Sequence, residues 1–239
     1  MRHIDYMDHS RPGRHNPADA SVILIVSLKH VFQRMDYWIP PNLWSVMLSL
    51  GVVTWPAAKA ALYKAVREGL MDPAEIRTNP RLIVRQTFFE QFGRSFVLVF
   101  ANLFILAFIL VALVFWLARD ELLLNMLAVL PMFCLAVWWL GQPYLFPIMV
   151  EYPVLPIFQV MKKTIWLVFS QPLYALVITG INTMLTLVGV IFLGPALLII
   201  PTLVSVISFH AYWDMTGREI PALIDPEEYA NRYDFSRRK

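Results

Sequence analysis

Long apolar runs separated by short polar stretches dominate the chain. Residues 95 to 118 and 122 to 150 hold no charged side chain, and only Arg119, Asp120 and Glu121 lie between them. A helix rises about 1.5 Å per residue and the hydrocarbon core of a bilayer is about 30 Å thick, so about 20 apolar residues can cross it. We therefore predict two spans, near 95–117 and 122–148, joined by a tight external turn.

The second of these runs is too long for one straight crossing, because 29 residues form a helix of about 43 Å. Prolines are common sites of helix kinks. Of Pro131, Pro143 and Pro147, we expect the main break at Gly141-Gln142-Pro143.

A third apolar stretch runs from Thr164 to Trp213 without Asp, Glu, Lys or Arg. Its 50 residues would extend about 75 Å as one helix, so the stretch must fold back. We predict the turn at Gly194-Pro195, with spans near 172–193 and 196–213.

The N-terminal part is more ambiguous. Leu43 to Ala58 is free of charge and predicts a span near 42–62, entered after Pro40 and Pro41 break the preceding helix. Ser21 to Trp38 begins apolar but carries charges that are costly inside a bilayer, and predicts an interfacial helix. If residues 21–39 cross the membrane instead, the chain has six spans and both ends lie inside.

Two basic amphipathic segments accompany the spans. The loop 63–94 lies in a region rich in Lys and Arg, which favours the cytoplasmic side. Within it, one predicted in-plane helix gathers Phe88, Phe89, Phe92 and Phe96 on one face, and Glu90 with Arg94 has the spacing of a surface ion pair. The other segment, 153–171, has an apolar face and a basic face: Val154, Ile157, Phe158, Met161 and Ile165 against Gln159, Lys162 and Lys163.

These patterns predict an all-α fold: a polytopic transmembrane helical bundle of five spans, or six if residues 21–39 also cross, with interfacial amphipathic helices. We divide the chain into a polar N-terminal tail with an interfacial helix (1–40), a membrane domain (41–214) and a polar C-terminal tail (215–239). The composition agrees, since 58% of the 239 residues are apolar and 15% are charged, against about 25% charged in soluble domains. The lone Cys134 excludes an intramolecular disulfide.

The sequence offers little chemistry. We expect His3, His9 and His15 to lie in a solvated tail, His210 to face interfacial water, and Glu151 to be an interfacial acid. The polar residues of the spans, Asn102, Asn125, Gln142, Gln171 and Asn182, are expected to hydrogen-bond between helices, with a substrate path as the alternative. We predict no catalytic residue, no cofactor and no metal site, because no phosphate loop, nucleophile elbow or acidic metal cluster is present.

Four short segments together resemble the YesL-like family of bacterial membrane proteins of unknown function. They are Asn42-Leu43-Trp44, Leu50-Gly51-Val52-Val53-Thr54, Pro56-Ala57-Ala58-Lys59-Ala60-Ala61-Leu62-Tyr63 and Phe88-Phe89-Glu90-Gln91-Phe92-Gly93-Arg94. Where Gly51 stands, that family usually has a proline. The resemblance implies a bacterial cytoplasmic-membrane protein linked to carbohydrate transport or sensing, and it supplies no catalytic residues.

We therefore expect a non-enzymatic accessory or sensing component of a transport or signalling complex. Its expected partners are membrane lipids and a transporter or sensor-kinase complex, and no nucleic acid. A small permease is the alternative, and a lipid-modifying enzyme is a third reading. We predict a multi-pass protein of the bacterial inner membrane with its C-terminus in the cytoplasm.

Overall fold

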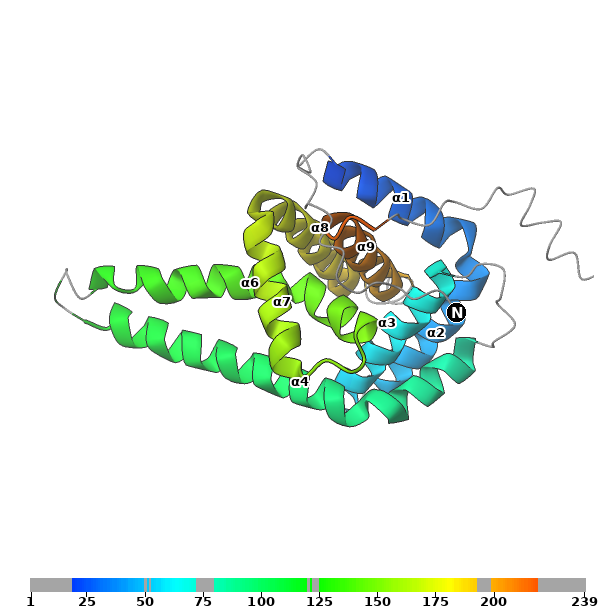
Figure 1. Cartoon of the computed structure of the whole chain (residues 1–239), viewed down its shortest axis with the longest axis horizontal. Coiled ribbons are helices and arrows are strands. Elements are labelled where there is room, and N and C mark those ends of the chain that lie inside the picture. The colour runs from blue at the N-terminus through cyan, green and yellow to red at the C-terminus, as the bar shows by residue number, and fades with distance from the viewer. Residues whose placement is uncertain are drawn as a thin grey trace, which may run out of the picture.

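A computed structural model describes residues 19–49, 51, 53–71, 80–119, 121, 125–192 and 199–218. Every regular element in these ranges is an α-helix, which confirms the predicted fold class (Figure 1). The helices are α1 (Asp19–Gln33), α2 (Met35–Leu48), α3 (Trp55–Met71), α4 (Pro80–Leu117), α6 (Val129–Glu151), α7 (Ile157–Ser170), α8 (Pro172–Ile191) and α9 (Ile200–Met215). The predicted tails fall largely on residues 1–18 and 219–239, outside the described residues.

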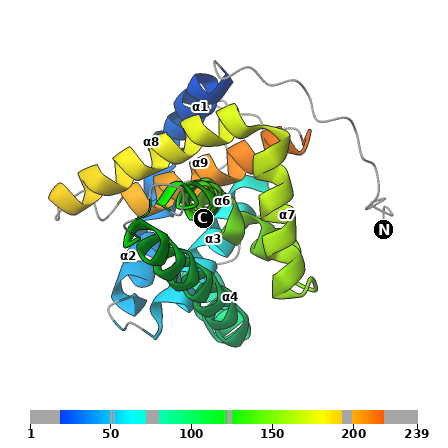
Figure 2. The same ribbon diagram turned by 90° about the vertical axis from the view of Figure 1, so that its left-hand side faces the viewer.

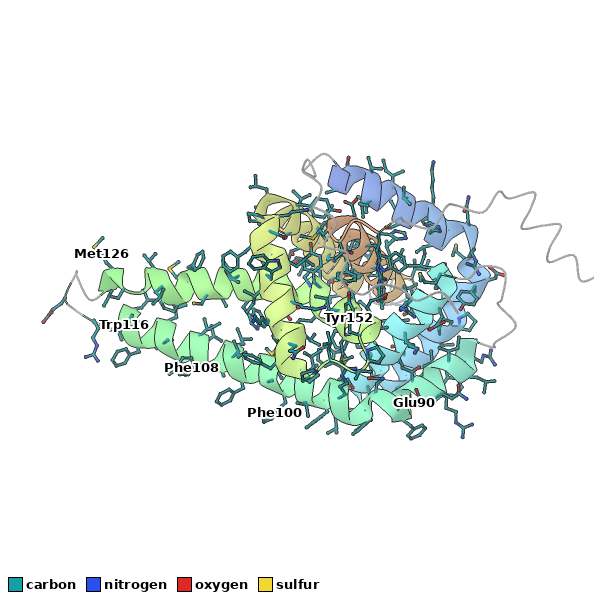
Figure 3. The ribbon with its side chains drawn as sticks, in the orientation of Figure 1. Glu90, Phe100, Phe108, Trp116, Met126 and Tyr152 are labelled. Carbon is teal, nitrogen blue, oxygen red and sulfur yellow. The ribbon has the colours of Figure 1, made fainter. Side chains whose placement is uncertain are left out.

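A long helical hairpin projects from a body of packed helices (Figure 1). It consists of the outer part of α4, from about Phe100 to Leu117, and the part of α6 that starts at Val129, which lie side by side (Figures 1 and 3). Apolar side chains point outward from it, among them Phe100 and Phe108, on the side of α4 away from α6 (Figure 3). A helix that is apolar on its exposed side needs a surrounding other than water.

Three helices are long and apolar enough to cross a membrane: α4 from Arg81 to Leu117, α6 and α8. This is fewer than the five or six spans that the apolar runs predicted. The three are not parallel. Figure 2 looks toward the body from the tip of the hairpin, and in it α8 lies across the line of sight.

The predicted span 42–62 is wrong, because two helices share that stretch. α2 ends at Leu48 and α3 begins at Trp55, with the Thr54 hydroxyl donating to the Gly51 carbonyl at 2.8 Å in the turn between them. The expected break at Pro40 and Pro41 is also wrong, since both prolines lie inside α2. Packing supports the helix there: the Ser45 hydroxyl donates to the Ala58 carbonyl of α3 at 3.0 Å.

The predicted span 196–213 corresponds to α9, a 16-residue helix in the core of the body. Its aromatic side chains Phe209, Tyr212 and Trp213 are buried against other helices, so its apolar character serves protein packing. The predicted turn at Gly194-Pro195 lies outside the described residues. α1 packs against α9 through Ile23, Ser27 and His30. Its opposite face, with Val22, Ile25 and Phe32, is exposed.

The predicted loop 63–94 is helical wherever it is described. Residues 63–71 belong to α3, and α4 starts at Pro80 and continues without interruption to Leu117. The in-plane helix and the span after it are therefore one helix. The inner part of α4 packs along α3, where Val84 and Phe88 contact the alanine-rich face of α3.

The break predicted at Gly141-Gln142-Pro143 is absent, because α6 runs through Pro143 and Pro147. At Gly141 α6 meets α7 so closely that a Cβ there would lie 2.9 Å from the Thr164 methyl group. α7 buries Val160, Thr164, Leu167 and Val168. Much of its predicted apolar face points outward instead, with Phe158 77% exposed.

Candidate functional site: a lysine cavity at the base of the hairpin

A cavity lies where the hairpin joins the body, and it forms two adjoining chambers of about 350 and 270 Å³. Lys59, Tyr63, Thr186 and Val204 line both chambers. We call this space the lysine cavity. The first chamber extends between α2, α3, α8 and α9, and the second extends to the part of α6 that carries Trp138, Trp139 and Gln142.

Lys59 is the only cationic side chain that lines the two chambers. Its ammonium group lies 4.9 Å from the ring centre of Phe146 and 5.5 Å from that of Trp55, two cation–π contacts. In the part of the chain that the structure describes, no acidic side chain forms an ion pair with it. Lys59 is half-buried, and this partial loss of hydration lowers its pKa to about 8.

Polar groups from α2, α3, α8 and α9 surround the same space. The Asn182 amide donates to the Ser208 hydroxyl at 3.1 Å, and the Tyr63 hydroxyl donates to the same oxygen at 3.5 Å. The amide oxygen of Asn182 is buried without a hydrogen-bond partner. Ser45, Ser49 and Ser205 add hydroxyl groups to the wall. A cation and one unsatisfied acceptor therefore lie in a mostly apolar cavity.

Sequence reasoning missed this site, because Lys59 lies near the end of the predicted span 42–62 and was not singled out as a candidate site residue. The available indication was its position between two pairs of alanines: Ala57, Ala58, Ala60 and Ala61 are all buried. Small residues let neighbouring helices approach closely, so a lysine among them has little room to turn away from its neighbours. Only the fold shows that α8 and α9 close over it.

Glu151 is not a free interfacial acid. Its carboxylate accepts a hydrogen bond from Arg67 Nε at 2.7 Å and another from the Arg218 guanidinium, and its side chain is 4% exposed. The three residues join α6 to α3 and to the segment after α9. A carboxylate held by two arginines is a poor proton donor, so the geometry favours a structural role.

Arg94 fixes the turn between α6 and α7. Its guanidinium donates to the carbonyls of Tyr152 at 2.7 Å and Leu155 at 2.6 Å, and to that of Pro153. Among the described residues it forms no ion pair with Glu90, so the predicted surface pair is wrong. Tyr152, Pro153 and Leu155 follow the last residue of α6, so the guanidinium binds carbonyls of the turn itself, near the negative end of the helix dipole.

His210 is fully buried, which corrects its prediction as an interfacial residue. Its Nδ1 lies 2.8 Å from the Ser27 hydroxyl of α1, and its ring centre lies 5.0 Å from that of His30. Burial and the nearby His30 lower the pKa of His210 to about 3. Ser27 and neutral His210 resemble part of a nucleophile–base arrangement. Both side chains are 0% exposed, however, and are thus inaccessible to a substrate.

The predicted polar residues of the spans pair in part. Asn102 of α4 and Gln142 of α6 exchange hydrogen bonds of 3.0 and 3.4 Å across the base of the hairpin. Gln142 also donates to the Trp138 carbonyl at 2.9 Å, one turn before Pro143. Asn182 reaches the lysine cavity, whereas Gln171 lies between α7 and α8 and Asn125 lies near the hairpin tip.

Among the described residues, no group of three or more His, Cys, Asp or Glu side chains is arranged to hold a metal ion. In comparisons with protein families, curated proteins and solved structures, no match to this chain was found. The resemblance to YesL-like proteins therefore stays a prediction.

Proposed function

We propose that the chain is a non-enzymatic accessory or sensing component of a membrane complex for carbohydrate transport or signalling. The observation that carries this proposal is the hairpin, whose apolar outer surface needs lipid or apolar helices of a partner around it. The link to carbohydrates comes from the YesL-like resemblance alone.

In this proposal the hairpin crosses the bacterial cytoplasmic membrane and returns, while the body lies at the cytoplasmic surface. The basic side chains of the body support this orientation through the positive-inside tendency: Arg67, Arg81, Arg85, Arg94, Lys162, Lys163 and Arg218. Two crossings place residues 19–71 and 199–218 on the same side, and the C-terminus is then cytoplasmic.

The crosswise helices fit the same arrangement. α7 runs across the direction of the hairpin in Figures 1 and 2 and exposes Phe158, Trp166 and Phe169 beside Lys162 and Lys163. Exposed aromatic rings beside lysines are typical of a helix that lies in a membrane interface. α8 lies across the hairpin too, with Leu173, Leu176 and Leu187 exposed.

The alternative of a small permease drew on a helix broken between Gly141 and Pro147. α6 is continuous there, so we favour the accessory role. The third interpretation, a lipid-modifying enzyme, needs acids, histidines or a metal site that converge at one interface. Glu151 and His210 alone are too few for that, and Glu151 contacts two arginines while His210 contacts Ser27.

The test is capture of the full chain by a C-terminal tag from native membranes in mild detergent, with mass spectrometry of what accompanies it. An unrelated membrane protein of similar size is the control. A specific transporter or sensor kinase is the expected result. A partnerless preparation that moves a substrate across liposomes would replace the proposal with the permease.

A further inference from the structure

The lysine cavity has the composition of a site for a charged amphiphile. Its walls are mostly apolar, with Trp138, Trp139, Leu187 and Val190 among them, and Lys59 supplies one positive charge. A total volume of several hundred Å³ lies in the range of small-ligand sites. The positive charge is suited to an anionic group of a ligand, and the apolar wall is suited to a hydrocarbon part of the same ligand.

The charge of Lys59 calls for an anion. The cation is surrounded by Phe146 and Trp55, and within the described ranges it has no ion pair. Lys59 is half-buried, so its ammonium group has lost part of its hydration without gaining an opposite charge, and a bound anion would supply that charge. The pKa of about 8 still leaves the amine mainly charged at neutral pH.

The remaining wall calls for a hydrocarbon chain. A small anion such as free phosphate needs several donors for its oxygens, whereas most of the lining beyond Lys59 and the hydroxyl groups is apolar. Leu187 and Val190 line the cavity and are also more than half exposed at the molecular surface. A chain attached to the anionic head therefore has an apolar route between the cavity and the outside of α8.

We propose that the lysine cavity binds an acidic amphiphile, with its anionic head at Lys59 and its chain along Trp138, Trp139 and Leu187. The unpartnered amide oxygen of Asn182 lies in the same wall and can accept a hydrogen bond from a head that carries a hydroxyl group, as that of phosphatidylglycerol does. The proposal rests on the hairpin crossing the membrane, since that crossing brings the base of the hairpin to the level of lipid headgroups. Acidic phospholipids and fatty acids share the two required parts, an anionic head and a hydrocarbon chain.

The test is native mass spectrometry of the purified full chain with dioleoyl phosphatidylglycerol, dioleoyl phosphatidylcholine or oleate. We expect the two anionic probes to bind and Lys59→Met to weaken them about tenfold, the effect of one charge-assisted contact. Lys64→Met is the matched control, because Lys64 lies on the same helix with its ammonium 3.9 Å from Glu68. It should bind like the unchanged chain.

The relative binding of oleate and phosphatidylglycerol identifies the source of the anionic head, and either preference supports the proposal. Equal binding of phosphatidylcholine, or unchanged anionic binding by Lys59→Met, overturns it. Effective competition by millimolar inorganic phosphate also overturns it, because the ligand would then be a small anion.

A second measurement needs no variant and covers the case in which Lys59→Met does not fold. The unchanged chain is treated with an amine-acetylating reagent, and the modification of each lysine is quantified. Phosphatidylglycerol should protect Lys59 several-fold more than Lys64, and equal protection contradicts the proposal. Both measurements use the purified protein, so the lysine cavity can pass its test even if the capture experiment yields no partner complex.

Discussion

In most proteins the more apolar helices are the more buried ones. The outer half of α4 and the whole of α3 show the opposite, because the apolar part of α4 is exposed and the more polar α3 is buried. The most apolar 18-residue stretch of α4 is only 6% buried inside the protein. α3 carries Lys59, Lys64, Arg67 and Glu68, yet most of its residues are buried. The difference indicates that the apolar residues of this chain serve two purposes: some pack against other helices, and others face the surroundings of the hairpin. Alanines and a glycine let α3 pack at the centre of the protein, whereas bulky side chains on α4 extend into what we propose is lipid.

The largest effect is expected on the hairpin. Phe108→Lys combined with Val111→Lys places two charges on its outward side, at about 2.5 to 3.5 kcal/mol each near the middle of a bilayer. We expect most of the protein to leave the carbonate-washed membrane fraction. Glu90→Lys, on the polar inner part of the same helix, should stay in that fraction. Full retention of the double variant would show that lipid does not surround this side of α4.

The next effect concerns the packing of α3. A Cβ at Gly69 would lie 2.5 Å from the Tyr37 ring and 2.7 Å from the Trp38 ring of α2. We expect Gly69→Val to lower the free energy of unfolding by about 3 kcal/mol through overpacking. Gly93→Ala on α4 is the control, because a Cβ there meets nothing within 4 Å. Thermal unfolding in detergent should rank Gly93→Ala at or above the unchanged chain, and an equal loss in both variants would contradict close packing at Gly69.

A smaller loss is expected at the ion pairs that fix α3 to α6. Glu151→Gln leaves Arg67 and Arg218 facing a neutral amide, and both arginines are partly exposed to water. We therefore expect a loss of about 2 kcal/mol, less than for a fully buried pair. Glu68→Gln, which removes a more exposed carboxylate, should cost much less. The melting temperatures of the two variants measure the difference, and equal values would show that Glu151 contributes no more than a surface acid.

The smallest effect is a pH dependence between α1 and α9. The pKa of His210 is lowered from 6.5 to about 3, so the unfolded chain binds more protons than the folded chain between these values. Stability is therefore complete above about pH 6.5 and falls as the pH drops, by at most about 2 kcal/mol at about pH 5. His210→Asn does not titrate and should lose less stability over this interval. An identical decline in both proteins would assign the effect to His30 or to other groups.

Hydropathy predicted part of this fold well. The hairpin, α7, α8 and the all-helical class follow from the spacing of charges along the chain. The spans at 42–62 and 196–213 were predicted wrongly, because an apolar segment looks the same whether protein or lipid surrounds it. Pro40, Pro41, Pro143 and Pro147 lie inside helices, since a proline removes only its own N–H and neighbouring helices can support the rest.

The candidate site was not predictable in the same way. Lys59 becomes unusual only when Phe146 of α6 and Thr186 of α8 lie against it, and these residues are distant in sequence. Glu151 and His210 were both noticed as titratable groups near apolar runs. Their partners Arg67 and Ser27 come from other helices and Arg218 comes from the segment after α9, so no local pattern indicated that these groups are already engaged.

α4 connects the hairpin to the body without an interruption. Its 38 residues extend about 57 Å along the helix, with the inner part on α3 and the outer part in the hairpin, and the helix changes direction between the two (Figure 1). Arg94 lies between the two parts and binds the turn before α7. If the hairpin lies in a membrane, as we propose, we expect a thinner bilayer or a neighbouring helix that tilts the outer part to alter the packing of the inner part against α3, which carries Lys59.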